Sequence, residues 1–174
     1  AGIMLEAFQG WGAFFYPKNY IKSLIKFAKK NKILIAIDEM QSGFGRTGKK
    51  FAFEHYSFVP DIVCCGKGMG SGMPISGIIT SSNIINIPDA NLQSTHSGNP
   101  LSCAAGTVTL DEIKRLNLVK ASEKKGKVFH NYLKKIKNEN SDLISFTSGK
   151  GLIGALIFRK YKKIPAQIVA TTIC

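Results

Sequence analysis

The sequence predicts an α/β protein built on a mostly parallel β-sheet. Short apolar runs rich in β-branched residues alternate with longer segments whose apolar residues recur at helical spacing, the pattern of strands connected by helices. Near residue 140 this pattern changes, and strand-like runs interrupted by glycines follow. We therefore expect residues 1–140 to form part of a large domain with its connecting helices. Residues 141–174 should begin a small C-terminal domain.

Apolar patterns define the expected elements of the first half. A helix is expected from Lys18 to Asn31, because apolar residues recur there at helical spacing and Pro17 suits the first turn. The run 33–38 is continuous and contains β-branched residues, which is typical of a strand buried on both faces, and 61–67 is a second buried run that ends in glycine and lysine. The expected strands are residues 2–8, 33–38, 61–67 and 75–81. The expected glycine-containing loops are residues 10–16, 42–48 and 68–74.

The second half is mainly helical up to residue 140. Helical spacing predicts helices at about 100–116 and 118–136, and residues 143–158 carry strand-like runs broken by glycines. The chain starts without an initiator Met inside a strand-like run, and its last residues, IVATTIC, read as a helix without a cap. Both ends indicate a fragment of a longer protein.

The charge and the apolar runs exclude several classes of protein. The formal net charge is +13, but it consists mostly of Lys spread over helical segments such as 22–32 and 124–137. Nucleic-acid readers use Arg forks and interleaved aromatic residues, which are missing here. No apolar run approaches the roughly 20 residues of a membrane-spanning helix, and no signal-peptide pattern is present. We expect neither a nucleic-acid nor a membrane partner.

The cysteines Cys64, Cys65, Cys103 and Cys174 form neither a disulfide framework nor a zinc-binding pattern. The adjacent pair lies in an apolar run, where thiols act as small hydrophobic groups. We therefore expect a cytoplasmic protein without a bound metal.

Three polar residues end strand-like runs, namely Glu6, Asp38 and Lys67. In open parallel sheets, ligands bind beyond the carboxyl ends of the strands. Lys67 lies between glycines after an apolar run, and apolar surroundings favour the neutral, nucleophilic amine that forms a Schiff base with an aldehyde cofactor. Such a cofactor needs an acidic partner at its ring nitrogen, which Asp38 can supply. Gln41 can donate to the phenolate oxygen of the ring.

Each of these residues also has a plain structural interpretation. An Asp at a strand end is often a cap or turn residue, and a Lys between glycines is often a loop residue. Spacing alone leaves both interpretations open.

An ordered set of motifs spans residues 37–78. An apolar strand ends in Asp-Glu with a Gln two residues beyond, and Gly-x-x-Arg-Thr-Gly, Pro-Asp-(apolar)-Gly-Lys and a glycine-rich run ending in Pro follow. These positions are Asp38, Glu39, Gln41, Gly43, Arg46, Thr47, Gly48, Pro60, Asp61, Gly66, Lys67, Gly72 and Pro74. LEAFQGWG (5–12) and STHSGNPLSCAA (94–105) flank them. Together they resemble the class III pyridoxal-phosphate-dependent aminotransferases, which include acetylornithine, ornithine and 4-aminobutyrate aminotransferases.

The resemblance implies a transferase of fold type I, with pyridoxal 5'-phosphate as cofactor. It implies that Lys67 forms the internal aldimine and moves the proton between substrate and cofactor. Asp38 would pair with the ring nitrogen and Gln41 would contact the phenolate oxygen. Thr95 would bind the cofactor phosphate of the neighbouring subunit, which implies a homodimer with shared active sites. Glu6 would support the pocket.

The sequence departs from the family pattern in a few places. Trp11 stands where the ornithine, acetylornithine and 4-aminobutyrate enzymes have a Glu that switches a substrate-binding arginine, so an aromatic wall replaces the carboxylate gate and those substrates are in doubt. Ala7 replaces a proline. His96 and Ser97 replace an aromatic residue and a glycine, and we interpret His96 as a packing or hydrogen-bonding residue.

The expected function is transfer of an amino group from an amino donor to a keto acid or aldehyde. Two alternatives stay open: an aminomutase, racemase or decarboxylase of the same fold, and a non-catalytic α/β binding module in which Lys67 is a loop residue. Since the chain covers less than half of a usual family member, we expect it to be a poor or inactive enzyme alone.

Overall fold

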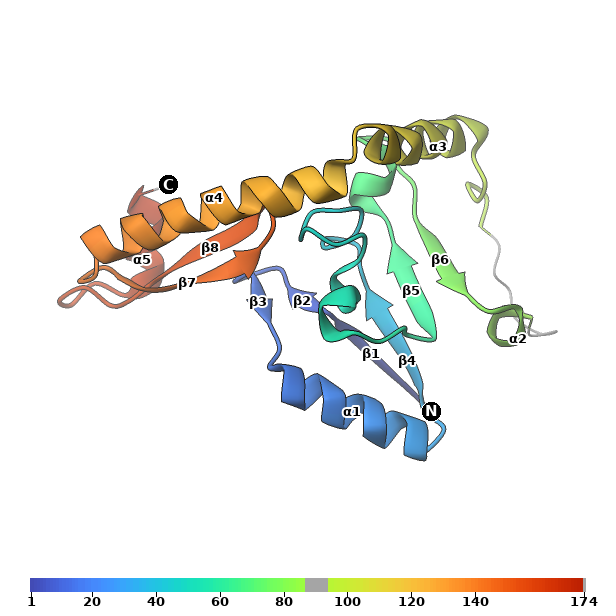
Figure 1. The fold of residues 1–174 in the computed structure, drawn as a ribbon, viewed down its shortest axis with the longest axis horizontal. Coiled ribbons are helices and arrows are strands. Elements are labelled where there is room, and N and C mark those ends of the chain that lie inside the picture. Colours follow the sequence, from blue (N-terminus) through green and yellow to red (C-terminus); the bar gives the residue numbers. More distant parts are fainter. Residues whose placement is uncertain (87–93, 174) are drawn as a thin grey trace.

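A computed structural model describes residues 1–86 and 94–173 of the chain. The main strands are β1 (Gly2–Glu6), β4 (Leu34–Asp38), β5 (Ile62–Cys65) and β6 (Gly77–Thr80). They form a four-stranded sheet in the order β1-β4-β5-β6 (Figure 1). β1, β4 and β5 run parallel, and β6 pairs antiparallel with β5. The predicted α/β class with a mostly parallel sheet is confirmed.

The remaining elements surround this sheet. The helices are α1 (Lys18–Lys30), α2 (Ser82–Ile85), α3 (Pro100–Arg115), α4 (Leu118–Glu139) and α5 (Ala166–Ile173), with the 3-10 helices η1 (Ala52–Tyr56) and η2 (Lys67–Gly70). Two antiparallel hairpins pair β2 (Phe8–Gln9) with β3 (Phe14–Phe15), and β7 (Ile144–Lys150) with β8 (Ile153–Phe158). The three long predicted helices are confirmed. Cys174, at the end of the expected C-terminal helix, lies outside the described residues.

One predicted strand, residues 2–8, is in fact two. β1 ends at Glu6, and the buried residue Ala7 separates it from β2. The Tyr56 hydroxyl donates a hydrogen bond of 3.0 Å to the Ala7 carbonyl, which satisfies this backbone group outside the sheet. The chain then turns back as the β2–β3 hairpin, so part of the segment expected to be a loop is paired strand.

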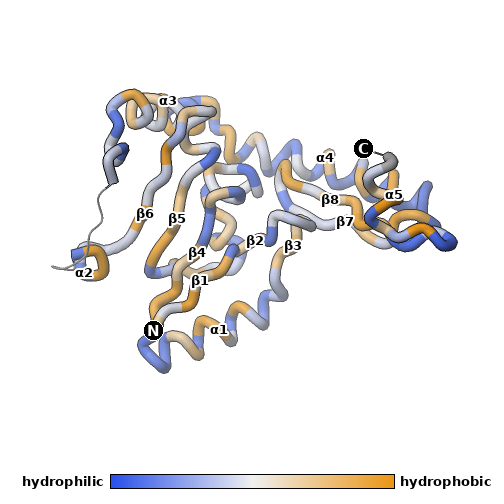
Figure 2. The backbone as a smooth tube through the Cα atoms, turned by 180° about the vertical axis from the view of Figure 1, so that it is seen from behind, coloured by the Kyte–Doolittle hydropathy of each residue, from blue (hydrophilic) through white to orange (hydrophobic). Residues whose placement is uncertain are grey.

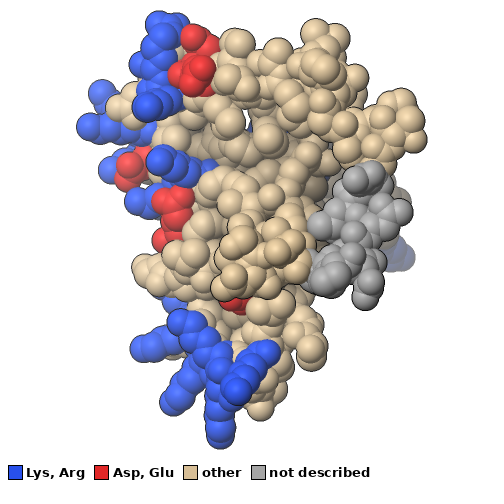
Figure 3. All heavy atoms as spheres, turned by 90° about the vertical axis from the view of Figure 1, so that its right-hand side faces the viewer, with Lys and Arg blue, Asp and Glu red and all other residues tan. Residues whose placement is uncertain are grey.

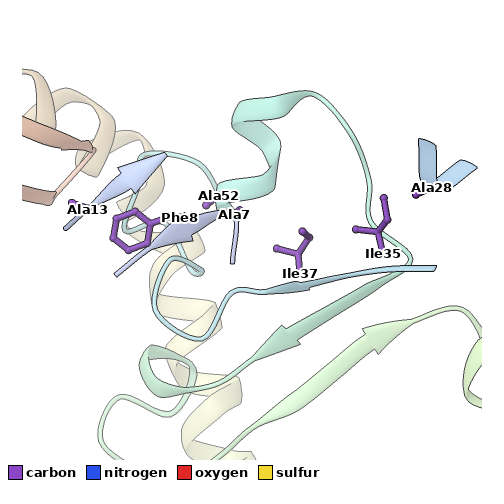
Figure 4. Packing of buried hydrophobic residues seen from close by; sticks show 7 residues of the cluster. All are labelled: Ala7, Phe8, Ala13, Ala28, Ile35, Ile37 and Ala52. Carbon is purple, nitrogen blue, oxygen red and sulfur yellow. The ribbon is translucent and has the colours of Figure 1, made fainter. Parts of the chain in front are cut away.

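The hydrophobic core lies on one face of the sheet, beneath α1 and η1. Figure 4 shows Ile35 and Ile37 of β4 in a row with Ala28 of α1, Ala52 of η1, and the hairpin residues. Burial on both faces of β4 was expected and is wrong for the described chain: Ile35 and Ile37 are buried, whereas Leu34 is 40% exposed. The tube in Figure 2 shows hydrophobic residues along β1 and β4, and α1 packs against β4.

α4 connects the sheet region with the second hairpin. In Figure 1 it runs from the end of α3 across β7 and β8. A Cβ placed on Gly126 of α4 would lie 2.5 Å from the Gly151 carbonyl oxygen, so only glycine permits this close approach. The predicted domain boundary falls just after α4, and the division into two domains stays a prediction. None of the helices in the part of the chain described is long and apolar enough to cross a membrane.

Candidate functional site

Three of the predicted site residues lie at one edge of the sheet. Glu6 ends β1 and is the register partner of Asp38, which ends β4. Lys67 follows β5 after Gly66. Because the carboxyl ends of parallel strands share an edge, the structure brings Glu6, Asp38 and Lys67 to the same side of the sheet.

Asp38 is half-buried and has an unused acceptor. Its Oδ1 accepts a hydrogen bond of 2.8 Å from the Met40 amide, while no donor among the described residues reaches Oδ2. The Met40 sulfur lies close to Gly66, where an added Cβ would come within 2.4 Å of it. Gly66 therefore leaves room for the Met40 side chain where β4 and β5 end. The Asp38 carboxylate keeps an acceptor oxygen that no donor among the described residues reaches.

The neighbour of Asp38 across the sheet is a neutral thiol. Cys64 is the register partner of Asp38 on β5. Burial, and then the negative charge of Asp38, raise the pKa of the Cys64 thiol. Cys64 thus remains uncharged at neutral pH and does not compete for a cation.

Lys67 begins η2 with a backbone φ of +45°, an uncommon conformation for a residue other than glycine. The side chain is exposed, and it lines an open hollow of about 580 Å³ together with Arg46 and the glycine-rich loop. The apolar surroundings expected for Lys67 are therefore not provided by residues 1–86 and 94–173. No ion pair within these residues engages its ammonium group.

Gln41 lies against the turn of the first hairpin. A Cβ on Gly10 would come within 2.0 Å of the Gln41 Oε1, so glycine makes room for the amide. Trp11 follows in this turn and is 81% exposed. Its ring meets Phe14 edge-on at 4.9 Å, and Phe14 lies 5.8 Å from Phe146 of β7. Trp11 therefore directly follows Gly10, the residue that lies against the Gln41 amide.

Thr95 is not brought to this edge by any contact among the described residues. It is exposed in a turn before α3, as is His96. This turn is closed by Ser94 and Ser97, whose hydroxyls lie 2.9 Å apart. Asn99 then caps α3 by accepting a hydrogen bond of 3.1 Å from the Ser102 amide.

The buried carboxylate Glu39 was assigned no role from the sequence. It is 0% exposed and accepts hydrogen bonds from the Ser42 hydroxyl and from the amides of Ala52 and Phe53, at 3.0 and 2.8 Å. Burial raises its pKa despite these hydrogen bonds. Glu39 thereby ties the chain after β4 to η1. Strand alternation was a usable signal, because it directs Glu39 to the face opposite that of Asp38.

Arg46 is a second residue whose position the sequence did not reveal. A Cβ on Gly68 would come within 2.8 Å of the Arg46 Nη2, so the guanidinium lies over the backbone beside Lys67. Its carbonyl accepts hydrogen bonds from the Ser122 hydroxyl at 3.1 Å and from the Leu152 amide at 2.9 Å. α4 and the β7–β8 turn therefore fix the Arg46 backbone.

Asp38 ends β4, Gln41 lies in the turn that follows it, and Lys67 follows β5, so this edge offers a carboxylate, an amide and an amine. This donor set suits an aldehyde cofactor with a basic ring nitrogen and a phenolate oxygen. Within residues 1–86 and 94–173, no three His, Cys, Asp or Glu side chains are grouped to hold a metal ion.

Comparison with curated proteins finds relatives along most of the chain. An acetylornithine aminotransferase of Caldanaerobacter subterraneus subsp. tengcongensis is 38% identical over 152 residues, which cover 87% of this chain and 38% of the relative. A putrescine aminotransferase of Pectobacterium atrosepticum is 36% identical over 165 residues, covering 92% of this chain and 35% of the relative. The chain thus spans well under half the length of these relatives.

Solved structures and a family model agree with these relatives. The acetylornithine aminotransferase of Elizabethkingia anophelis matches with a TM-score of 0.83 and 34% identity, covering 90% of this chain and 42% of that one. An ornithine aminotransferase of Plasmodium yoelii matches with a TM-score of 0.82 and 32% identity, covering 89% of this chain and 42% of that one. The model of the family described as aminotransferase class-III matches residues 1–172. This chain therefore belongs to the class-III aminotransferases.

Proposed function

We propose that the whole protein is a transaminase that moves an amino group from an amino donor to a keto acid or aldehyde. Class-III aminotransferases depend on pyridoxal 5'-phosphate. The observation that supports the proposal most is that Asp38 ends β4 and Lys67 follows the neighbouring parallel strand β5, while Oδ2 of Asp38 accepts no hydrogen bond from the described residues. Ligands of open α/β sheets bind at this edge.

The residues present fit this cofactor. Lys67 would hold it covalently through Nζ, Asp38 would keep its ring nitrogen protonated, and Gln41 would donate to its phenolate oxygen. When bound, the cofactor supplies an electron sink for the carbon that loses a proton. The Lys67 amine would move that proton, since it is exposed and free of ion pairs among the described residues. Glu6, beside Asp38 in the register, would support the same edge.

The surface around α3 supports a homodimer. Figure 3 shows a broad, largely uncharged area in its centre, with most of the visible Lys and Arg at the left side and the bottom of the view. Large apolar side chains of α3 and β6 are exposed: Leu101 by 67%, Val108 by 62% and Ile78 by 58%. Exposed apolar surface of this kind marks interaction sites. Thr95 lies in the turn before α3, so we propose that it reaches the partner's cofactor phosphate.

Trp11 bears on the substrate. Relatives of this chain are named for acetylornithine, putrescine and 4-aminobutyrate. In this chain an exposed indole follows the glycine that contacts Gln41. A wall of Trp11 and Phe14 offers apolar contact and no carboxylate, so we propose an amino donor or acceptor whose remote end is apolar.

The free thiols of Cys64, Cys65 and Cys103 support a reducing, cytoplasmic location.

The test is to locate the covalent attachment in the full-length protein. The protein is incubated with pyridoxal 5'-phosphate, reduced with borohydride, and analysed by peptide mass spectrometry. We expect one adduct, on Lys67, which disappears in Lys67→Ala and persists in Lys125→Ala, a change to an exposed helix lysine. An adduct scattered over surface lysines, or none in a folded protein, would show that Lys67 is an ordinary loop residue.

A further inference from the structure

A second hollow lies away from the Lys67 edge, where the 44–54 segment meets the junction of α3 and α4. Its volume is about 870 Å³, within the roughly 300–1,000 Å³ typical of small-molecule sites. It shares no lining residue with the hollow beside Lys67. Its apolar lining, called its apolar floor below, consists of Phe44, Phe51, Leu110, Ile113 and Val119.

The walls of this hollow are fixed to one another. A Cβ on Gly45 would come within 3.2 Å of the Val119 side chain, and one on Gly48 within 3.1 Å of the Glu123 Cα. The Phe44 and Phe51 rings meet edge-on at 5.6 Å. With the bond from Ser122 to the carbonyl of Arg46, these contacts hold the loop on α4. The hollow is thus preformed rather than a gap between loosely connected parts.

The rim of the hollow is positively charged. Four lysines line it, namely Lys49, Lys50, Lys114 and Lys120. The two carboxylates in the lining, Glu54 and Glu123, leave a lining charge of 4 − 2 = +2. Glu54 is already engaged, because it accepts a hydrogen bond of 2.9 Å from the Phe51 amide. The ion pairs of the described residues, Arg115–Glu112 and Lys135–Glu139, include none of the rim lysines.

We propose that this hollow binds a small organic anion with an aromatic or branched aliphatic body. The apolar floor would accept the body, and the rim lysines would hold the anionic group while their aliphatic stems extend the apolar wall. Cations around a concave apolar surface, with no ion pair to the described residues, complement such a ligand in charge as well as in shape. The site is separate from the transaminase site and does not depend on it.

Two dyes test both parts of the proposal with the full-length protein. 8-Anilinonaphthalene-1-sulfonate carries an anionic group, and N-phenyl-1-naphthylamine has the same ring system without it. We expect the sulfonate to bind about tenfold more tightly than the neutral dye by fluorescence titration. We expect the double variant Lys49→Glu/Lys120→Glu to weaken the sulfonate about tenfold and to change the neutral dye by less than about twofold, since only the charge of the rim changes.

The matched control is Lys125→Glu/Lys127→Glu, which makes the same change of charge on α4 at exposed positions outside the hollow. It should leave the affinity for the sulfonate within about twofold. Equal weakening in both double variants would mean that only the overall charge matters and would overturn the proposal. So would equal binding of the two dyes, or no binding of the sulfonate to the folded protein.

Discussion

At the scale of single residues, Glu39 holds the segment after β4 against η1 through its hydrogen bonds. Its oxygens accept three hydrogen bonds in a fully buried site. In Glu39→Gln one oxygen becomes an NH₂ group, which faces donors instead of accepting from them. We expect the free energy of unfolding to fall by about 1–3 kcal/mol, the cost of an unsatisfied buried polar group. Urea denaturation measures it, and Glu139→Gln, on an exposed side chain, should change it by less than about 0.5 kcal/mol.

Trp11 allows a test of substrate preference. Removing the indole in Trp11→Ala should raise the KM for an arylalkylamine donor about tenfold, the loss of roughly 1.4 kcal/mol of apolar contact. The KM for alanine, which has no remote apolar group, should change by less than about twofold. Tyr132→Ala, on an exposed ring of α4, serves as the control. Equal changes for both donors would remove Trp11 from the substrate wall.

Part of the site follows from the sequence and part does not. Asp38 and Lys67 were located because strand ends can be read from apolar runs, and parallel strands end at a common edge. The contact of Arg46 with Gly68 depends on how the 42–48 loop folds onto α4, through hydrogen bonds from Ser122 and Leu152. Such contacts between distant segments leave no local pattern. Thr95 and the sharing of sites between subunits stay predictions.

At the scale of elements, the packing of α4 on the second hairpin makes stability depend on pH. His130 is half-buried, and its Nε2 has no hydrogen-bond partner among the described residues. Burial above all, and then Lys134 and Lys150, lower the pKa of His130, and burial likewise lowers that of His55. The folded state therefore binds these protons less readily than the unfolded state, whose histidines titrate near 6.5.

The pKa values of His55 and His130 are lower in the folded state than in the unfolded state. Their neutral imidazoles therefore contribute fully to the free energy of unfolding above pH 6.5, and this contribution is lost as the pH falls toward the folded-state pKa values. We expect the free energy of unfolding to fall between pH 8 and pH 5, as followed by urea denaturation. His130→Gln, which cannot be protonated, should make this fall shallower. His96→Gln, on an exposed turn, should not change how steeply the free energy of unfolding falls with pH. An identical pH profile for His130→Gln and the wild type would contradict the assignment.

The elements differ in how far the sequence determines them. α1, α3 and α4 were predicted because their apolar residues repeat at helical spacing, which is a local property. The break between β1 and β2 was missed, because the Ala7 carbonyl accepts its hydrogen bond from the Tyr56 hydroxyl and not from a neighbouring strand. Tyr56 lies far along the chain, so no local pattern reveals this hydrogen bond. The burial of β4 was overestimated because an apolar run does not say which of its faces other elements cover.

At the scale of the whole molecule, charge and apolar surface are separated. A net charge of +13 would make association of two copies unfavourable if it were spread evenly. Figure 3 instead shows a largely uncharged central area, on the side that carries α3 and β6. Leu101→Lys/Val108→Lys should raise the dissociation constant of the proposed dimer at least about a hundredfold, roughly 2.7 kcal/mol, in analytical ultracentrifugation. Val128→Lys, at an exposed position of α4, should leave this dissociation constant unchanged.

The proposed sharing of the active site between subunits can be tested apart from the proposed dimerisation. Lys67→Ala and Thr95→Ala should each have little activity as pure dimers, because every site then lacks either the amine or the phosphate contact. Unfolded and refolded together in equal amounts, they should regain about a quarter of wild-type activity, since about half of the dimers are hybrids and each hybrid holds one intact site. Refolding each variant alone is the control. No recovery in mixtures that ultracentrifugation shows to be dimeric would place Thr95 and Lys67 in the same subunit's site, because then no hybrid would contain an unaltered pair.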